Sequence, residues 1–430
     1  MGRKKYKGDK MILSIILSII LLGILIFVHE LAHFLIAKVS KIGAPVFSIG
    51  FGPPLIKFKR SETEYRIGIF PLGGYVKLKG MEPGEIKGES DEYYSRNPFL
   101  RILVVAGGPF ANLLSGFIIY FLTIIALGIE TPKTTFVVPD DTTSVFMKND
   151  NILYMNGKKI NDWNDIENMI KEKNMVVVLR GEKIETLSVM KDEFYKISPL
   201  FPPVIGGLEK DGPASKTGLM KGDSIISINE KKVYFWDDIR EMVAESPGET
   251  LKIVWSRNGE IMEGYIVPVK TKTLSGDSII EIGVIGIVTP YIKKKVGILS
   301  SLKIASIQFE DTSLKIFKTL SMLIRRKVSP RELGGPISIV YLTQKTMKWG
   351  IKNFIFFVAF ISINLGIVNL IPIPPLDGSH IILGFYQLIT RKKPGENALK
   401  ILENIGVFIL LFLIVFITMN DILRVIFKRF

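Results

Sequence analysis

Four long apolar runs punctuate the chain. They are Met11 to Val28, Ile102 to Ile129, Asn353 to Leu376, and Asn404 to Asn420. Each is close to the roughly 20 residues that an α-helix needs to cross the hydrocarbon core of a bilayer. The pattern therefore predicts a polytopic α-helical membrane protein with about four transmembrane helices, whose two halves flank a water-soluble middle.

The soluble middle repeats itself. Residues 150–166 align with residues 223–239 at a constant shift of 73 residues, from Asp150 to Asp223. Each copy predicts a strand of alternating apolar and polar residues, an Asn-centred turn, a second short strand and an amphipathic helix. We expect two inserted α+β domains of about this size.

The turns before the second copy resemble those of PDZ domains. Residues 212–223 contain a Gly-Pro-Ala turn and a Gly-Leu turn that lead into Gly-Asp. A PDZ domain binds an extended peptide as an added strand. The first copy lacks these turns, so we expect a degenerate PDZ-like domain there. An alternative is that both copies act only as spacers or size filters.

These patterns give a domain plan. We expect an N-terminal membrane half at 1–130, a degenerate PDZ-like domain at 131–197, a PDZ domain at 198–270, an amphipathic membrane-associated connector at 271–350, and a C-terminal membrane half at 351–430. Within the connector, Lys303 to Arg326 has apolar residues at helical spacing. It is expected to lie along the membrane surface or to pack on the soluble domains.

Charge and composition narrow the choice of partners. The chain has a net charge of +15, yet acidic residues outnumber basic ones between Glu130 and Pro290. The excess basic residues therefore flank the apolar runs, where they meet anionic lipid headgroups. We expect the lipid bilayer as a partner and no nucleic acid. The absence of cysteine excludes thiol nucleophiles, disulfides and Cys-ligated zinc.

The first apolar run is also compatible with a cleaved signal peptide, because basic residues precede it. The run is longer than a typical signal-peptide core, and no small-x-small cleavage site follows it. We therefore expect this segment to stay in the protein.

A His-Glu-x-x-His motif, residues 29–33, stands at the end of the first apolar run. Residues four apart share a helix face, so His29 and His33 can reach one Zn²⁺ while Glu30 acts on a metal-bound water. Such a water has a pKa near 7 and serves as the nucleophile of a hydrolase. Ionisable groups beside lipid are costly and usually functional, which supports this interpretation over a plain helix end.

A catalytic zinc site needs a third protein ligand. Residues 369–380 contain three prolines within four residues, which prevent a regular helix and expose backbone at membrane depth. Asp377 is the candidate ligand there. His380 is an alternative fourth ligand, although a closed site would leave no position for water. Asn364 and Asn369 are candidates for holding substrate backbone or a developing oxyanion, or for hydrogen bonds between helices.

Taken together, these motifs resemble the site-2 protease family, specifically its RseP-like branch. Pro71 to Lys77, with Gly73 and Gly74, is similar to that branch's membrane-associated β-loop, whose edge would be presented to an unwound substrate segment. Residues 96–112 are similar to the start of the family's second membrane helix. Ser379 departs from the family, which more often has glycine there.

The resemblance implies an intramembrane zinc metalloprotease. Zinc would be held by His29, His33 and Asp377, with Glu30 as the catalytic acid/base and Asn369 near the substrate. Its substrates would be single-spanning membrane proteins, such as an anti-sigma factor, already trimmed by another protease. The location implied is the bacterial inner membrane, with the PDZ pair outside the cytoplasm. The basic residues before Ile12 favour the opposite orientation of the N-terminus, but we expect the family topology.

Three other functions compete with this one. A membrane-tethered PDZ scaffold would have no need for ionisable groups beside lipid. A soluble-type zinc metalloprotease anchored by helices would cut outside the membrane. A transporter also uses unwound membrane segments, but the chain shows no inverted repeat.

Overall fold

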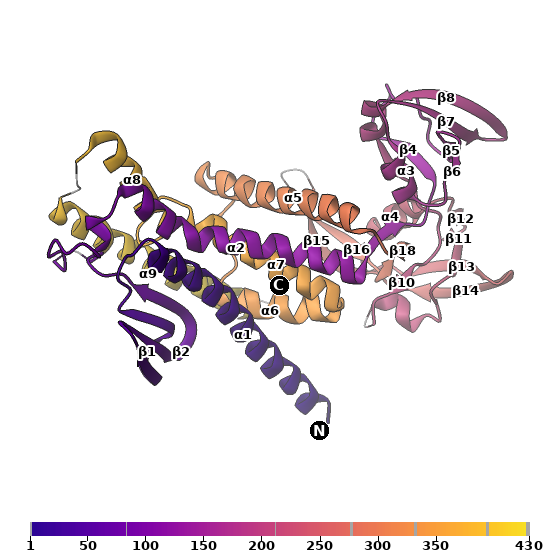
Figure 1. The fold of residues 1–430 in the computed structure, drawn as a ribbon. Coiled ribbons are helices and arrows are strands. Elements are labelled where there is room, and N and C mark those ends of the chain that lie inside the picture. The colour runs from indigo at the N-terminus through magenta and orange to yellow at the C-terminus, as the bar shows by residue number, and fades with distance from the viewer. Residues whose placement is uncertain are drawn as a thin grey trace. The chain divides into compact units, whose positions relative to one another are not determined.

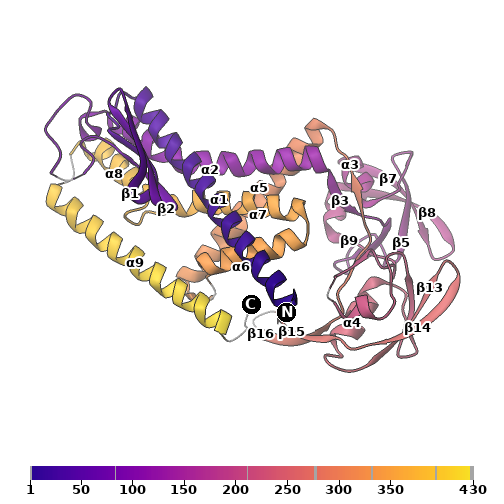
Figure 2. The same cartoon turned by 90° about the horizontal axis from the view of Figure 1, so that it is seen from below.

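The computed structural model of the protein describes residues 2–82, 84–210, 212–275, 278–330, 333–392 and 395–426. It divides into two compact units, each visible in Figures 1 and 2. The helical unit comprises Met1–Leu127 and Val296–Phe430, and the insert comprises Gly128–Lys295.

The helical unit carries the apolar runs. Its elements are α1 (Gly2–Val39), β1 (Val46–Arg60), β2 (Thr63–Lys77), α2 (Pro98–Leu127), α5 (Ile298–Ile324), α6 (Pro336–Lys348), α7 (Ile351–Asn369), α8 (Asp377–Thr390) and α9 (Glu396–Ile426). Among the described residues, four helical stretches are long and apolar enough to cross a membrane: Met11–Val39, Pro98–Leu127, Ile351–Asn369 and Leu399–Arg424. The predicted multi-pass membrane architecture is confirmed.

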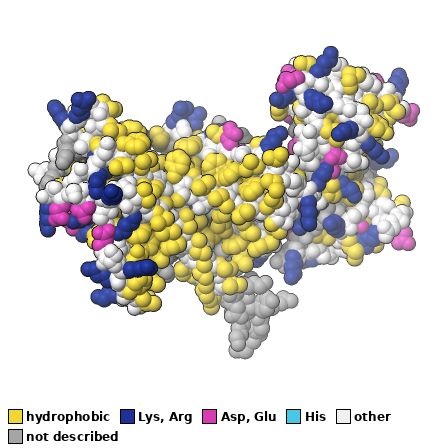
Figure 3. All heavy atoms as spheres, viewed as in Figure 1, with side chains coloured by type: hydrophobic (Ala, Val, Ile, Leu, Met, Phe, Trp, Pro, Cys, Tyr) yellow, Lys and Arg dark blue, Asp and Glu magenta, His cyan; other side chains and the backbone are white. Residues whose placement is uncertain are grey.

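Large apolar side chains cover much of the face of the helical unit that Figure 3 shows. Leu114 on α2 and Phe412 on α9 are more than half exposed, for example. Such a surface is costly in water and is the expected one in a bilayer, where lipid tails surround it.

Helix α2 lies at the centre of this unit, against α1, α5, α7 and α8. Small residues permit the close contacts. A Cβ atom added at Gly107 would collide with Ile36 of α1, and one added at Gly116 would collide with Ile363 of α7. Glycines at helix interfaces let membrane helices approach closely, and here they bring three helices to one place.

Strands β1 and β2 form a small sheet next to α1. Residues 46–49 pair both with residues 64–67 and with residues 74–77, whereas 64–67 also pair with the end of β1. In the described part of the chain, residues 74–77 have no strand on their other side. The end of β2 is therefore a free strand edge.

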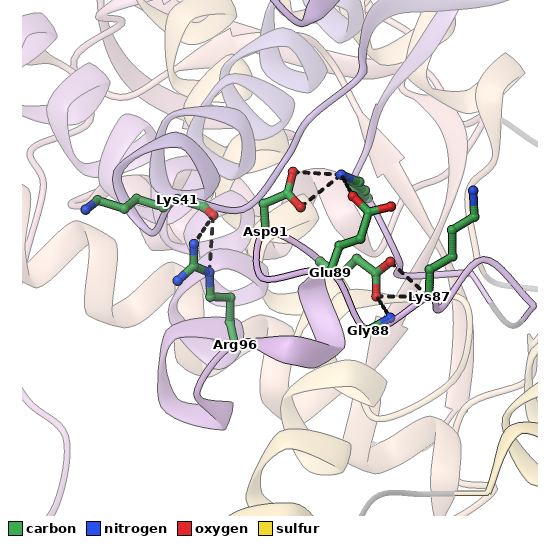
Figure 4. A network of polar contacts seen from close by, with 8 residues as sticks. Lys41, Lys87, Gly88, Glu89, Asp91 and Arg96 are labelled. Atoms are coloured by element: carbon green, nitrogen blue, oxygen red, sulfur yellow. Dashed lines mark hydrogen bonds and ion pairs between the residues drawn. The ribbon is translucent and has the colours of Figure 1, made fainter.

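The loop from β2 to α2 is held by polar contacts, as Figure 4 shows. The Arg96 guanidinium donates to the Lys41 carbonyl at 2.7 Å, just beyond the end of α1. Lys79 bonds Asp91 at 2.9 Å, and Glu92 accepts from the Lys87 amide at 2.9 Å. These contacts fix the start of α2 beside the end of α1.

The insert consists of two α+β lobes with separate cores. The first has a sheet of β4 (Phe136–Pro139), β5 (Asp150–Met155), β6 (Lys158–Lys159), β7 (Lys173–Arg180), β8 (Lys183–Met190) and β9 (Ile197–Pro199), with α3 (Trp163–Met169). The second has β11 (Ser224–Ile228), β12 (Lys231–Lys232), β13 (Leu251–Arg257) and β14 (Glu260–Ile266), with α4 (Trp236–Ala244).

Further strand pairs complete the insert. They are β3 (Ile129–Pro132) with β18 (Tyr291–Lys294), β10 (Gly207–Leu208) with β17 (Ile287–Val288), and β15 (Val269–Ser275) with β16 (Ser278–Val284). Short 3-10 helices span Tyr93–Ser95, Lys191–Lys196 and Pro213–Lys216.

The structure differs from the expected connector at 271–350. Its first part forms strands of the insert, and Ile285 belongs to the core of the second lobe, past residue 270 where we expected that domain to end. These residues belong to the insert because they pair with strands far away in the sequence. Strand β17, for example, pairs with β10. Helix begins only at Ile298.

Candidate metal centre

Two imidazoles and one carboxylate converge between α1 and the start of α8. His29 and His33 lie one turn apart on α1, with ring centroids 4.7 Å apart, and both are buried. Asp377 is the first residue of α8. A turn that contains three prolines follows Asn369 and separates α7 from α8. The Asp377 carboxylate therefore lies at the start of a new helix, beside the two histidines of α1.

The three donor atoms have the spacing of a metal site. The His29 and His33 Nε2 atoms are 3.1 Å apart, and Asp377 Oδ2 lies 3.0 Å from the first and 3.5 Å from the second. Tetrahedral Zn²⁺ with bonds of about 2.0–2.1 Å needs donors roughly 3.3 Å apart. Nitrogen and carboxylate oxygen are also donors that Zn²⁺ takes in catalytic sites.

Gly108 of α2 closes one side of this group. A Cβ atom added there would collide with Nε2 of His33 and would lie 2.7 Å from Nε2 of His29. A side chain at this position would occupy the space directly against the donor nitrogens. The space that a bound ion needs therefore depends on glycine at residue 108.

Helix α2 also contacts the outer nitrogens of both rings. Nδ1 of His33 lies 2.8 Å from the Val104 carbonyl. Because a carbonyl only accepts, this Nδ1 carries the ring proton and leaves Nε2 free to bind a metal. Nδ1 of His29 lies 3.0 Å from the side-chain nitrogen of Asn112, which is fully buried.

Glu30 lies beside the donor group, against β2. A Cβ atom at Gly74 would be 3.2 Å from its Cγ, and Val76 of the same strand lines a cavity together with Glu30. This cavity has a volume of about 320 Å³, and its lining includes Glu30, both histidines, Tyr75, Asn369 and Asp377. A carboxylate, a candidate metal group and a strand edge thus share one cavity.

Comparisons with known proteins show the family of this chain. The model of Peptidase family M50 matches residues 17–413. The chain belongs to Peptidase family M50. It is similar to the zinc metalloprotease RasP of Bacillus licheniformis, with 30% identity over 430 residues that cover 96% of this chain and 99% of the relative. It is 28% identical over 436 residues to the regulator of sigma-W protease RasP of Bacillus subtilis, covering 96% and 98%.

This M50 protein is therefore a zinc metalloprotease built on a multi-pass membrane unit. The predicted site-2 protease relationship, enzyme class and cofactor are confirmed.

The structure brings most of the predicted site residues together. Asn369, at the end of α7, has its amide nitrogen 3.4 Å from Nε2 of His29. Gly74 contacts Glu30, whereas Gly73, with φ of 139°, lies against the ring of Phe51. Gly73 therefore shapes the β-loop rather than the cavity wall.

Two other candidates lie apart from the M50 site. Asn364 is half-buried on α7 and is absent from the cavity lining among the described residues. His380 lines a separate small cavity with Tyr93, Tyr94 and Arg101. Among the described residues, the group of donor atoms close enough to share one ion is His29, His33 and Asp377, without His380.

Sequence reasoning missed the contribution of α2. Val104, Gly108 and Asn112 follow each other at intervals of four residues, so they share one face of this helix. A buried amide in a membrane-spanning helix is a functional signal in itself, because polar groups are costly there. Asn112 could have been selected on that ground.

Proposed function

We propose that His29, His33 and Asp377 hold the catalytic zinc ion and that Glu30 is the general acid/base. The observation that carries this proposal is the 3.0–3.5 Å spacing of the three donor atoms, with Gly108 leaving room beside them. Bound zinc would supply a water of lowered pKa and would polarise the scissile carbonyl.

The residues around that group have separate tasks. Glu30 takes the proton of the attacking water and returns it to the leaving amine. Asn369 donates from its amide to the carbonyl oxygen as negative charge develops there. The free edge at residues 74–77 binds the substrate backbone as an added strand, which holds the peptide extended across Glu30. An extended substrate exposes a peptide bond that a helix would hide.

We propose that the substrates are single-spanning membrane proteins cut within or near their transmembrane segment. The cavity is lined by residues of α1, α2 and the end of α7, all of which are membrane-sized apolar helices. The Bacillus subtilis relative is a regulator of sigma-W protease, and this likeness supports a role as the second cut in regulated intramembrane proteolysis. An anti-sigma factor trimmed by another protease is the substrate class that fits.

We propose further that the two lobes of the insert are PDZ-like, with the first, at 131–197, degenerate. The support is a groove of about 1020 Å³ between α4 and residues 280–287, with Ile239, Val243 and Ile285 among its lining residues. The expected location is the bacterial inner membrane with the insert on its outer side. There the groove would select trimmed chain ends.

The test combines metal analysis with cleavage mapping in detergent. Wild-type protein should contain one zinc per chain and cut a model single-spanning substrate inside its membrane segment. Glu30→Gln should keep the zinc and lose cleavage, because the general base is gone. Asp377→Ala should lower zinc occupancy, because one ligand is removed.

Each assignment has an outcome that would end it. Full turnover by Glu30→Gln would remove Glu30 from the mechanism, and unchanged zinc in Asp377→Ala would remove that ligand. Cleavage only outside the membrane segment would favour an anchored protease of the soluble type. Folded protein without zinc or cleavage would favour a scaffold.

A further inference from the structure

One buried polar group near the site has no use in the mechanism above. The Asn112 side chain on α2 is fully buried, and its Oδ1 has no hydrogen-bond partner among the described residues. Its Nδ2 lies 3.0 Å from Nδ1 of His29. An unpaired buried amide oxygen normally costs about 1–3 kcal/mol, so its presence next to a site residue calls for a reason.

The position of Asn112 is fixed by its backbone. The Ser362 hydroxyl of α7 donates to the Asn112 carbonyl at 2.7 Å, and both residues are buried. Gly116, one turn further along α2, packs directly against Ala359 and Ile363 of α7. Since the backbone is held, the amide can change only by turning about its own side-chain bonds. It always presents either Oδ1 or Nδ2 to His29.

The oxygen and the nitrogen of the Asn112 amide each suit one of the two neutral tautomers of His29. With Nδ2 donating to Nδ1, the ring proton is on Nε2, where it meets Oδ2 of Asp377 at 3.0 Å. A ligating Nε2 must carry no proton, so the ring proton is then on Nδ1 and needs an acceptor. A half-turn of the amide supplies Oδ1, the atom that otherwise lacks a partner.

His33 does not have this freedom. Its Nδ1 faces the Val104 backbone carbonyl at 2.8 Å, and that oxygen only accepts. The ring is therefore held permanently in the form whose Nε2 can bind a metal. The two imidazoles of the motif are oriented by the same helix, one by a fixed acceptor and one by a group that can both donate and accept.

We propose that Asn112 is a positioning residue that holds His29 in its metal-binding form and tolerates its metal-free form. The proposal rests on the zinc site proposed above. Outer hydrogen-bond partners of ligating histidines typically change metal affinity 10–100-fold when removed. Asn112→Leu should weaken zinc binding by about that factor, because a leucine of similar size offers no acceptor to Nδ1.

The decisive variant is Asn112→Asp. Its carboxylate accepts from Nδ1 as the turned amide would, so zinc affinity should equal or exceed that of the wild type. Thr123→Val is the matched control on the same helix, because the Thr123 hydroxyl bonds only the Ile119 carbonyl of its own helix among the described contacts. This control should leave the affinity unchanged.

Affinities would be measured by chelator competition on the full-length protein in detergent, with zinc alone as the ligand. A second readout uses the fact that the chain has three histidines. In ¹⁵N-histidine-labelled, zinc-loaded protein, wild type and Asn112→Asp should show a hydrogen-bonded Nδ1 proton on His29, and Asn112→Leu should lose that signal. A packing role alone would not move this resonance.

The outcomes separate this inference from the proposed function. If zinc affinity is the same in His29→Ala as in wild type, the proposed zinc site fails. If His29→Ala loses zinc while Asn112→Leu binds it as tightly as wild type, only the role of Asn112 is overturned. Equal weakening by Asn112→Asp and Asn112→Leu would also overturn it, because the acceptor would then be irrelevant.

Discussion

The two lobes of the insert share one polar framework. In the first, Asp150 accepts from Arg180 and from the Met147 amide. In the second, Asp223 accepts from Arg257 and from the Met220 amide in the same way. Both aspartates are buried. The repeat seen in the sequence is thus also a repeat of hydrogen bonds, which join β5 to β7 in the first lobe and the start of β11 to β13 in the second.

The faces beside the two helices differ. In the first lobe, Lys294 from β18 bonds both Asp162 and Asp165 at the start of α3, and the Thr131 hydroxyl of β3 accepts from the Asn164 amide. The strands that enter and leave the insert therefore hold the start of α3. In the second lobe, α4 borders the groove of about 1020 Å³.

The shared hydrogen bonds concern the stability of the two lobes, whereas the different surroundings of α3 and α4 concern peptide binding. A duplicated framework keeps both lobes folded, whereas the helix face that would receive a peptide is open in one lobe and tied down in the other. Variants in both lobes can therefore test whether the buried Asp–Arg contacts contribute equally to the two lobes and whether the surfaces beside α3 and α4 differ in peptide binding.

The largest effect should come from the buried aspartates. Asp150→Ala and Asp223→Ala should each destabilise their own lobe by about 3 kcal/mol, because each removes a buried carboxylate that accepts from both an Arg and a backbone amide. The Arg keeps other acceptors, whereas the amide loses the one described for it. Hydrogen exchange measured by mass spectrometry on the intact protein would show faster exchange confined to the altered lobe. Faster exchange in both lobes would mean that the framework is shared and not duplicated.

Acid offers the same test without mutation. Burial alone would raise the pKa of Asp223, but hydrogen bonds from Arg257 and the Met220 amide outweigh it and hold that pKa below its ordinary value. A lowered folded-state pKa adds stability above the unfolded-state value, and this stability is lost as the pH falls through the folded-state value. After division by the intrinsic exchange rate, which itself slows in acid, the protection of amides in the second lobe should fall below a pH of about 4.

The second effect concerns the groove. Ala244 lines it at the end of α4, and Lys171, which is 73 residues earlier, is exposed just after α3 ends at Met169. Ala244→Trp should lower the affinity for short peptides with apolar C-termini by about tenfold, because the larger ring fills the groove. Lys171→Trp should leave it unchanged. Fluorescence anisotropy would measure both, and equal loss in the two variants would contradict a single open groove.

Local patterns account for what could be predicted of this fold. A membrane span is a continuous apolar run, and the two histidines proposed as ligands are four residues apart, so both are visible without tertiary information. The strands after residue 270 are different, because β17 and β18 pair with β10 and β3 far away in the chain. Nothing in their short sequences marks those partners.

The candidate site also has parts that local sequence patterns reveal and parts that they do not. His29, Glu30 and His33 form a local motif, and the prolines before Asp377 mark a break in a membrane helix. The contacts from Val104 and Asn112 reach His33 and His29 across 71 and 83 residues of sequence. An apolar helix reveals its length by composition, but not the face that it presents to a neighbour.

A smaller effect should follow from releasing α3. Lys294→Met removes the cation that bonds Asp162 and Asp165 and leaves two acidic groups close together. We expect a loss of about 1 kcal/mol, seen as faster exchange at residues 163–169 with residues 236–244 unaffected. Peptide binding that appears in the first lobe of this variant would indicate that the Lys294 contacts alone prevented it.

The smallest effect lies in the matched two-residue turns. The first lobe has Asn156-Gly157, and the second has Asn229-Glu230, with φ of 46° and 67°. Turns of this kind favour glycine at the second position, because other residues are strained at positive φ. Glu230→Gly should stabilise the second lobe by up to about 1 kcal/mol, and Gly157→Glu should destabilise the first by a similar amount. Thermal unfolding of the intact protein, with lobe-resolved exchange, would measure both. Changes of the same sign would show that the two turns are not equivalent.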